Sequence, residues 1–216
     1  MKHKHTHYIY ASFAFLLFVA LGYMVKFYPE ALTGFDSNIQ TWVRGDLPGG
    51  LTAFFKMITT LGNTSVQAVI AILAVIWLYL RQYKAEAIFV GTSGVLASIM
   101  IMRLKYIYQR PRPSITHLVH AGGYSFPSGH SLGTFMILGA IAIVLTQRLV
   151  KKAAKTAVYG ITGLLIFLVG LSRIYVGVHY PTDVLAGFTL AFGLLNAIYP
   201  TYDRIRFEWR FQSKQK

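Results

Sequence analysis

The 216-residue sequence contains no cysteine, so neither a disulfide framework nor a thiolate metal site is available to the fold. Acidic residues are also few: seven Asp and Glu stand against 21 Lys and Arg, which gives a formal net charge of +14. Such a balance suggests nucleic acid as a partner. Most of the excess charge, however, lies in short segments between apolar runs, and this distribution argues against a nucleic-acid surface.

Charged side chains of either sign make up only 13% of the sequence and hydrophobic residues 55%, whereas soluble domains average about 25% charged residues. Six apolar runs are long enough to cross most of a hydrocarbon core of about 30 Å. They are residues 8–25, 66–80, 85–102, 131–147, 156–172 and 183–199. We therefore predict an all-α, polytopic membrane protein with six transmembrane helices, in a single domain over residues 1–216.

The distribution of Lys and Arg predicts the orientation in the membrane, because the side richer in these residues is cytoplasmic. Most of the 21 fall near the two termini and in the connections 81–84 and 148–155. Both termini are therefore predicted to lie on the cytoplasmic side of the plasma membrane. The segments Lys105–His130 and Ser172–Asp183 are predicted to be extracytoplasmic.

Residues 27–65 are too polar to span the membrane, yet apolar residues recur there twice at helical spacing, on either side of a DLPGG turn. The two sets are Phe35, Ile39, Trp42 and Val43, then Leu51, Phe54, Phe55 and Ile58. This pattern predicts two short amphipathic helices in the outer interface, within the first extracytoplasmic loop. A gate for lipid and a plain structural cover are both consistent with it. In the last two spans, GITGLL and AGFTLAFG place small residues where close helix packing requires them.

Lys105, Arg110 and Arg112 lie close to the predicted membrane boundary, where a cluster of charges needs a partner. Lysine offers a mobile point charge and arginine a planar fork, and phosphate oxygens are ligands that use both. Anchoring of a loop to lipid head groups is the alternative interpretation.

The residues Pro127–His130, PSGH, precede the fourth predicted span and therefore lie at a helix N-terminus, which attracts anions. Ser128 is a good N-cap, and Gly129 allows close approach to the backbone. His130 would then lie beside a bound phosphate, where an imidazole that titrates near neutrality can protonate a leaving alkoxide. A capped helix with a structural histidine is the alternative.

The second polar segment supplies a further phosphate-ligand candidate, Arg173, and a second histidine, His179. Pro181 suits the first turn of a helix, so Asp183 falls in that turn and within reach of His179. A carboxylate bonded to one ring nitrogen fixes the tautomer and leaves the other nitrogen free to attack. Two such histidines beside a cluster of cations favour in-line phosphoryl transfer, with one as nucleophile and the other as leaving-group acid.

Three motifs occur in order: K-x6-R-P at Lys105–Pro113, P-S-G-H at Pro127–His130, and S-R-x5-H-x3-D at Ser172–Asp183. Together they resemble the signature of the type 2 phosphatidic acid phosphatase superfamily. The predicted spans resemble its six-helix membrane members, which include bacterial phosphatidylglycerophosphate phosphatases and undecaprenyl pyrophosphate phosphatases.

The resemblance implies a role for each residue that matches a motif. His179 would form a phosphohistidine intermediate, with Asp183 orienting it, and His130 would protonate the leaving lipid oxygen and then activate water. The groups that would bind the phosphoryl oxygens are Lys105, Arg112, Ser128, Gly129 and Arg173. No metal and no other cofactor is implied. Three further residues match no motif: Arg110, His117 and His120.

We therefore expect an integral membrane phosphatase that acts on a lipid phosphomonoester, with phosphatidylglycerophosphate as the first substrate. Undecaprenyl pyrophosphate and phosphatidic acid are the alternatives, and no residue distinguishes them. A lipid phosphotransferase would use the same phosphohistidine with a hydroxyl acceptor. A transporter is disfavoured because the predicted spans carry almost no internal charge, and six spans argue against a soluble vanadium haloperoxidase of the same superfamily.

Overall fold

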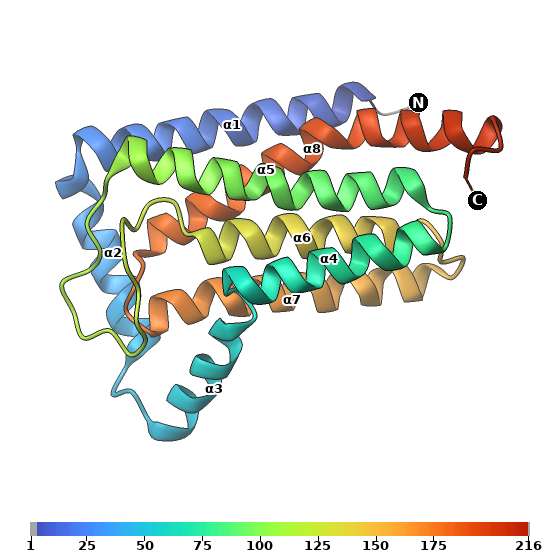
Figure 1. Cartoon of the computed structure of the whole chain (residues 1–216). Helices are drawn as coiled ribbons and strands as arrows, with labels where there is room; N and C mark the ends of the chain where they lie inside the picture. The colour runs from blue at the N-terminus through green and yellow to red at the C-terminus, as the bar shows by residue number, and fades with distance from the viewer. Residues whose placement is uncertain (1–3, 216) are drawn as a thin grey trace.

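The computed structural model describes residues 4–215, and this part of the chain folds into eight α-helices joined by loops. The helices are α1 (Lys4–Phe27), α2 (Pro29–Arg44), α3 (Gly49–Thr60), α4 (Thr64–Leu80), α5 (Lys84–Tyr108), α6 (Gly129–Thr146), α7 (Lys152–Tyr175) and α8 (Pro181–Phe211). Six of them, α1 and α4 to α8, run alongside one another as a bundle (Figure 1). Both termini lie at one end of the bundle, and α2, α3 and the loop after α5 lie at the other (Figure 1).

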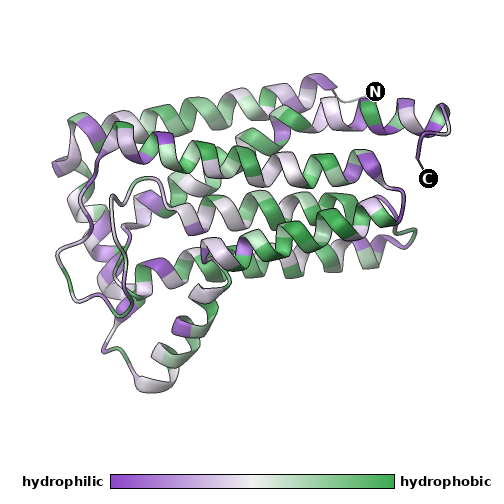
Figure 2. Cartoon of the chain, viewed as in Figure 1, coloured by the Kyte–Doolittle hydropathy of each residue, from purple (hydrophilic) through white to green (hydrophobic). Residues whose placement is uncertain are grey.

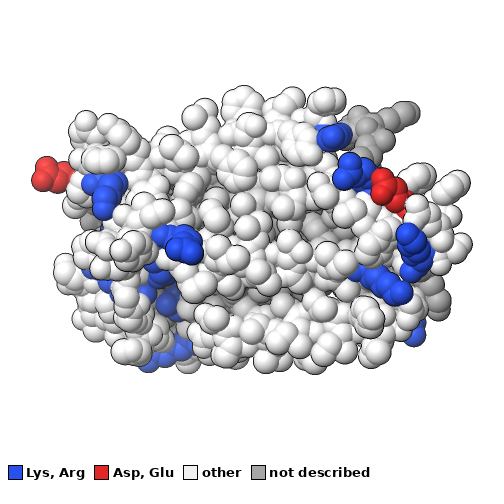
Figure 3. All heavy atoms as spheres, turned by 45° about the horizontal axis from the view of Figure 1, so that its top comes forward, with Lys and Arg blue, Asp and Glu red and all other residues white. Residues whose placement is uncertain are grey.

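Within the described residues, five helices are long and apolar enough to cross a membrane: α1, α5, α6, α7 and α8. The remaining predicted span, residues 66–80, falls on α4, which has 17 residues and qualifies together with α3, from which it is bent by 50°. Apolar residues concentrate along the middle of the bundle (Figure 2). Lys and Arg side chains gather at both ends, with a nearly uncharged band between them on the face shown (Figure 3). The chain is a multi-pass α-helical membrane protein, as the sequence predicts.

Three helices, α5, α7 and α8, extend at least three residues past the C-terminal ends predicted for their spans. α5 and α7 run on far enough to include Lys105 and Arg173, so these two cations lie in last helical turns. α8 continues well beyond residue 199 although Pro200 lies inside it. Proline removes a backbone donor and usually ends a helix. Here the residues after Pro200 pack onto the bundle. The hydroxyl of Tyr202 donates to Oε1 of Gln147 at 2.6 Å, and Nη2 of Arg210 donates to the buried Glu86.

The amphipathic helices predicted in the first long loop are α2 and α3. In α3, Phe55 and Ile58 are buried, and the ring centroid of Phe55 lies 4.5 Å from that of Tyr175. α2 turns its polar side inward: Asp36 and Gln40 are buried, whereas Trp42 is 84% exposed. The outward apolar side chains of α2 suit a membrane interface, and the inward polar ones face the end of the bundle where the motifs meet.

Glycines allow close contact at the centre of the bundle. A Cβ atom at Gly187 would lie 2.9 Å from the carbonyl oxygen of Ser128, and one at Gly193 would lie 2.8 Å from the Phe15 ring. The packing role predicted for AGFTLAFG is therefore confirmed. The same prediction for GITGLL is wrong, because a Cβ atom at Gly160 or Gly163 would meet nothing within 4 Å in the described part of the chain. These two glycines face the outside of α7.

Candidate active site

The two polar segments predicted to form one site meet at the end of the bundle that carries α2 and α3 (Figure 1). Backbone hydrogen bonds join them directly. The N–H of Leu118 donates to the carbonyl oxygen of Val176 at 2.9 Å, and the N–H of Ser128 donates to that of Asp183 at 3.0 Å. Residues more than fifty positions apart are thus held in register by main-chain contacts.

His179 lies in the short connection between α7 and α8 and is 2% exposed. Its Nδ1 is 3.3 Å from Oδ2 of Asp183, and its Nε2 is 3.4 Å from Nη1 of Arg112. A guanidinium group can only donate, so Nε2 is the accepting nitrogen and Nδ1 carries the proton toward Asp183. Burial lowers the pKa of His179 well below its ordinary value, and the charges of Arg173, Arg112 and Lys105 lower it further. The imidazole is therefore neutral, with the lone pair on Nε2 that a nucleophile requires.

Asp183 is fully buried in the first turn of α8 and accepts three hydrogen bonds. Besides His179, the donors are the backbone N–H of Tyr180, 2.9 Å from Oδ2, and Nη1 of Arg110, 2.7 Å from Oδ1. The guanidinium carbon of Arg110 also lies 3.9 Å from the ring centroid of Tyr180. Arg110, which matches no motif, therefore holds the carboxylate that orients the histidine.

Asp36 is a member of this network that sequence reasoning missed. Its Oδ2 is 2.8 Å from Nη2 of Arg110, and it accepts from both the N–H and the hydroxyl of Thr182, at 2.9 and 2.8 Å. Arg110 thus lies between two buried carboxylates, Asp36 and Asp183. The one sequence signal is a carboxylate beside Phe35 on a short amphipathic helix, and that signal does not say which side of the helix is buried.

Arg112 is held by main-chain oxygens of the surrounding loops. Its guanidinium donates to the carbonyl oxygens of Gly122, Gly123 and Val178, at 2.8, 3.1 and 2.6 Å. Burial lowers the pKa of Arg112, and the charge of Asp183 opposes this effect. Lys105 reaches the same place from α5, and its Nζ donates to the carbonyl oxygen of Tyr124.

Arg173 approaches from the last turn of α7 and is 3% exposed. Its Nη1 donates to Oγ1 of Thr59, in α3, at 2.6 Å. Its Nε is buried without a hydrogen-bond partner in the part of the chain that the structure describes. A buried, unpaired guanidinium N–H is costly, and an anion bound beside it would satisfy it.

The PSGH segment forms the start of α6, as predicted. Ser128 is the N-cap, and its fully buried Oγ accepts from the N–H and the hydroxyl of Ser131, at 3.4 and 2.9 Å. Gly129 lines the cavity described below, but the side chain of Ser128 does not. Nε2 of His130 lies 3.0 Å from Oδ1 of Asn63, a second residue that sequence reasoning missed.

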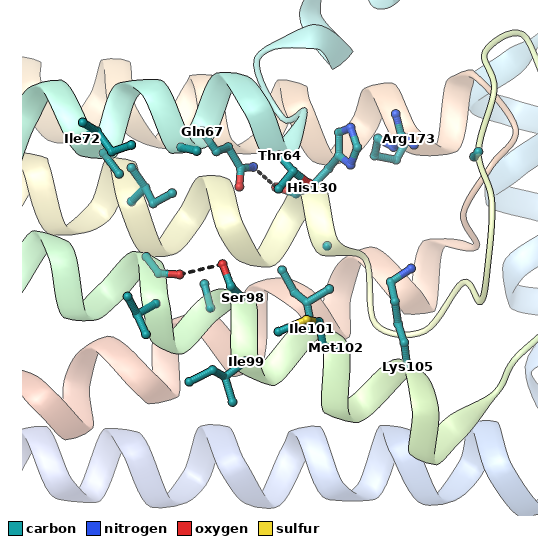
Figure 4. Close-up of a pocket in the computed structure, with 18 of the residues that line it drawn as sticks. Thr64, Gln67, Ile72, Ser98, Ile99, Ile101, Met102, Lys105, His130 and Arg173 are labelled. Atoms are coloured by element: carbon teal, nitrogen blue, oxygen red, sulfur yellow. Dashed lines mark hydrogen bonds between the residues drawn. The ribbon is translucent and has the colours of Figure 1, made fainter.

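A cavity of about 930 Å³ opens beside these groups. Five of the predicted site side chains line one end of it: Lys105, Arg112, His130, Arg173 and His179. Figure 4 shows Lys105, His130 and Arg173 around that end. No Asp or Glu is among the described residues that line the cavity, so its polar end is strongly favourable for an anion.

The rest of the cavity runs between α4 and α5 and is mainly apolar. Its lining includes Ile72, Val75, Ile76, Val95 and Ile99. Ile72 is 56% exposed and Val95 61% exposed on the outside of the bundle, so the cavity opens sideways, where lipid surrounds the protein. A chain of hydrocarbon fits this half, and a phosphate group fits the other.

Two loop histidines outside the motifs have different surroundings. Nε2 of His117 lies 2.9 Å from the carbonyl oxygen of Pro113, within its own loop. His120 lines the cavity, as does Gly122. Within residues 4–215, no group of three or more His, Asp or Glu is arranged to hold a metal ion.

Fold and site together define a multi-pass membrane protein with a cluster of cationic side chains, two histidines and a largely apolar cavity that opens on the side of the bundle. The chain belongs to the PAP2 superfamily, whose family model matches residues 86–207, more than half of its length. All eight predicted site residues fall inside the matched region. The family membership predicted from the three motifs is therefore confirmed.

Two curated relatives from Bacillus subtilis (strain 168) are similar to the chain over part of its length. Phosphatidylglycerophosphatase B is 43% identical over 106 residues, which are 49% of this chain and 49% of that protein. Undecaprenyl-diphosphatase BcrC is 32% identical over 133 residues, 59% of this chain and 64% of that protein. The alignments thus span just under half of the first relative and just under two thirds of the second.

Similarity to solved structures extends over most of the chain. The crystal structure of a transmembrane PAP2-type phosphatidylglycerolphosphate phosphatase from Bacillus subtilis matches with a TM-score of 0.83 and 28% identity. The match covers 90% of this chain and 96% of that one. Aquifex aeolicus LpxE, at 23% identity and a TM-score of 0.61, shares the fold.

Proposed function

We propose that the protein is an integral membrane lipid phosphatase that hydrolyses phosphatidylglycerophosphate to phosphatidylglycerol and phosphate. The observation that carries the proposal is the cavity, which joins a cationic pocket containing His179 to an apolar groove open to lipid. A lipid phosphate has the same two halves. The similarity to phosphatidylglycerophosphatase B supports this substrate. The whole chain acts as a single domain, with the reacting groups between Lys105 and Asp183.

In the first step, the Nε2 lone pair of His179 attacks phosphorus, and the bond between phosphorus and the lipid oxygen breaks. The lipid oxygen takes a proton from His130 and leaves as an alcohol. The imidazole of His179 becomes positively charged as the phosphohistidine forms, and Asp183, which accepts its Nδ1–H, stabilises that charge.

Charge that builds on the phosphoryl oxygens is stabilised by groups fixed before the substrate arrives. They are the side chains of Lys105, Arg112 and Arg173, the backbone N–H of Gly129 and the start of α6 capped by Ser128. Such preorganised donors contribute much of the catalysis in phosphoryl transfer. In the second step His130 takes a proton from water, the water oxygen attacks the phosphohistidine, and phosphate leaves with His179 restored.

The proposal places the site on the extracytoplasmic face of the plasma membrane and both termini in the cytoplasm. Both termini lie at the end of the bundle opposite α2 and α3 (Figure 1). The connection between α6 and α7 lies at the same end as the termini and carries Arg148 and Lys151, and Lys152 is the first residue of α7. The positive-inside rule supports a cytoplasmic location for that end.

A panel of purified-enzyme assays tests the substrate. Phosphatidylglycerophosphate, undecaprenyl pyrophosphate and phosphatidic acid are compared at matched surface concentration. The highest kcat/KM is expected for phosphatidylglycerophosphate. A higher value for undecaprenyl pyrophosphate would favour the second candidate, which the similarity to undecaprenyl-diphosphatase BcrC supports. Phosphate release from none of the three would reject the proposal.

A phosphotransferase would pass the phosphoryl group from the same histidine to an alcohol in place of water. Mass analysis of the products, with and without an added lipid or sugar hydroxyl acceptor, separates the two activities. Hydrolysis predicts free phosphate in both reactions and no phosphorylated acceptor.

A further inference from the structure

The bend between α3 and α4 lies directly against the acid histidine of the proposed mechanism. Residues 61–63 form this bend, where the two helix axes differ by 50°. A Cβ atom on Gly62 would lie 2.5 Å from Cδ2 of His130, closer than two non-bonded carbon atoms can approach. The imidazole of His130 therefore packs on the main chain of Gly62, and a residue without a side chain is required there.

Asn63 makes the second contact from this bend. It is the N-cap of α4, where asparagine ordinarily accepts a hydrogen bond from the first helical turn. Its side chain makes no such bond to the described residues of that turn. Its Oδ1 lies instead 3.0 Å from Nε2 of His130. An amide oxygen only accepts, so Nε2 carries the hydrogen in this contact.

Gln67, one turn further along α4, holds the main chain of the same histidine. Its side-chain N–H groups donate to the carbonyl oxygens of His130 and Gly62, at 3.4 and 3.0 Å, and to the hydroxyl of Thr134 at 2.9 Å. The close-up view shows Gln67 and His130 side by side at the polar end of the cavity (Figure 4). The first turn of α4 thus fixes both the ring and the backbone of His130.

We infer that Asn63 is a positioning residue that makes Nδ1 of His130 the nitrogen that exchanges protons during catalysis. The inference rests on the proposed phosphohistidine mechanism. Asn63 is uncharged and accepts from Nε2–H whether or not His130 is protonated, so only Nδ1 gains and loses a proton. In the first step the imidazolium gives its Nδ1 proton to the lipid oxygen, and the electron pair of the broken P–O bond becomes the new O–H bond. His130 is then neutral, and its Nδ1 lone pair takes the proton of the attacking water.

The dependence on the leaving group separates this role from a purely structural one. p-Nitrophenyl phosphate releases a phenolate that leaves without a proton, whereas phosphatidic acid releases an alkoxide that needs one. The kcat/KM value reports the steps up to departure of the leaving group, so a slow second step does not affect it. Asn63→Ala is expected to lower kcat/KM by about tenfold or more for phosphatidic acid in detergent micelles, and by less than about threefold for p-nitrophenyl phosphate.

Three further variants complete the experiment. His130→Ala is expected to show the same selectivity with a larger loss, because it removes the acid itself. Asn63→Asp keeps an oxygen acceptor and is expected to recover most of the activity toward phosphatidic acid. Asn38→Ala, at an exposed position in α2, is the matched control and is expected to behave as wild type.

Two results would overturn the inference, and only the second is also a failure of the proposed function. In the first, His130→Ala loses more activity toward phosphatidic acid than toward p-nitrophenyl phosphate, but Asn63→Ala has no effect or reduces both activities equally. The role of Asn63 is then wrong and the mechanism stands. If the wild-type protein releases phosphate from none of p-nitrophenyl phosphate, phosphatidic acid and phosphatidylglycerophosphate, the proposed function fails and the inference fails with it.

Discussion

Arg110 donates to Asp183 at 2.7 Å, and both side chains are buried, with exposed fractions of 9% and 0%. The other arm of the same guanidinium holds Asp36, in α2, at 2.8 Å. Asp183, which contacts His179, is therefore linked through Arg110 to Asp36 and so to α2, a helix far away in the sequence. Arg110 itself lies in the loop just before Arg112. Two of the seven acidic residues in the chain thus form ion pairs with this one arginine.

Removal of Arg110 is expected to destabilise the protein and its active site together. Arg110→Ala would leave two carboxylates buried without their partner, which typically costs about 3–5 kcal/mol. The melting temperature in detergent is expected to fall, and the rate of phosphate release is expected to decrease by more than about tenfold. Arg103→Ala, which removes an exposed arginine of α5, is the matched control. Equal melting temperatures for the two variants would contradict the role assigned to Arg110.

Loss of the proposed nucleophile is expected to abolish turnover without preventing membrane insertion. His179→Ala removes the Nε2 lone pair, so phosphate release should fall to background, while the protein still fractionates with membranes. Wild-type protein denatured with detergent at alkaline pH is expected to retain label from a ³²P-labelled lipid phosphate, and later acid treatment is expected to release that label; the variant is expected to retain none. Undiminished turnover by His179→Ala would remove the central mechanism.

The protonation of His179 is expected to differ from that of an ordinary histidine. Burial holds its pKa well below the usual value of about 6.5, so the folded protein keeps the ring neutral at a pH where the unfolded chain binds a proton. The contribution of this group to stability is therefore complete above about pH 6.5 and is lost as the pH falls toward the lower folded pKa. NMR of histidine-labelled protein, with the signal assigned through His179→Ala, is expected to show a neutral ring at pH 6. A titration midpoint near 6.5 would contradict the burial argument.

The apolar half of the cavity is expected to affect activity toward lipid substrates and not toward a small water-soluble phosphate ester. Ala71→Trp places a large ring in the groove between α4 and α5, so kcat/KM for a long-chain lipid phosphate should fall by about tenfold. The value for p-nitrophenyl phosphate should change by less than about twofold. Leu73→Trp, on the exposed side of α4, is the control. Equal losses on both substrates would mean that the lipid tail lies elsewhere.

The orientation in the membrane can be tested without removing native thiols, because the chain has no cysteine. Ser114→Cys, in the exposed loop beside the site, is expected to react with an impermeant maleimide added to intact cells. Lys151→Cys, in the connection after α6, is expected to react only after the membrane is opened. The reverse pattern would invert the proposed topology.

The sequence predicts much of the fold because its signals are local. Long apolar runs identify the membrane helices, since a residue buried in lipid must be apolar whatever its neighbours are. Ser128 and Pro181 mark helix starts for equally local reasons, and the structure places the N-cap of α6 and the first residue of α8 at these two positions. The ends of helices are predicted less well: α8 passes Pro200 because contacts with the end of α6, through Tyr202, outweigh the missing backbone donor.

The partners of the motif residues could not be predicted in the same way. Asp36 and Asp183 lie 74 and 73 residues from Arg110, and Asn63 lies 67 residues from His130. Nothing in the local pattern of an amphipathic helix says that α2 turns its polar side inward. In the sequence, residues 61–63 look like a linker between two helices, and the contact of Asn63 with His130 appears only in the folded chain.

The class of the protein, its membrane helices and the residue types gathered in two polar segments all follow from composition, periodicity and motif spacing, which depend only on neighbours along the chain. The meeting of the two segments, the sharing of Arg110 by two carboxylates and the contact of Asn63 with His130 appear only in the folded chain. These contacts depend on the rotation and packing of whole helices, and that arrangement is set by the sum of many distant contacts.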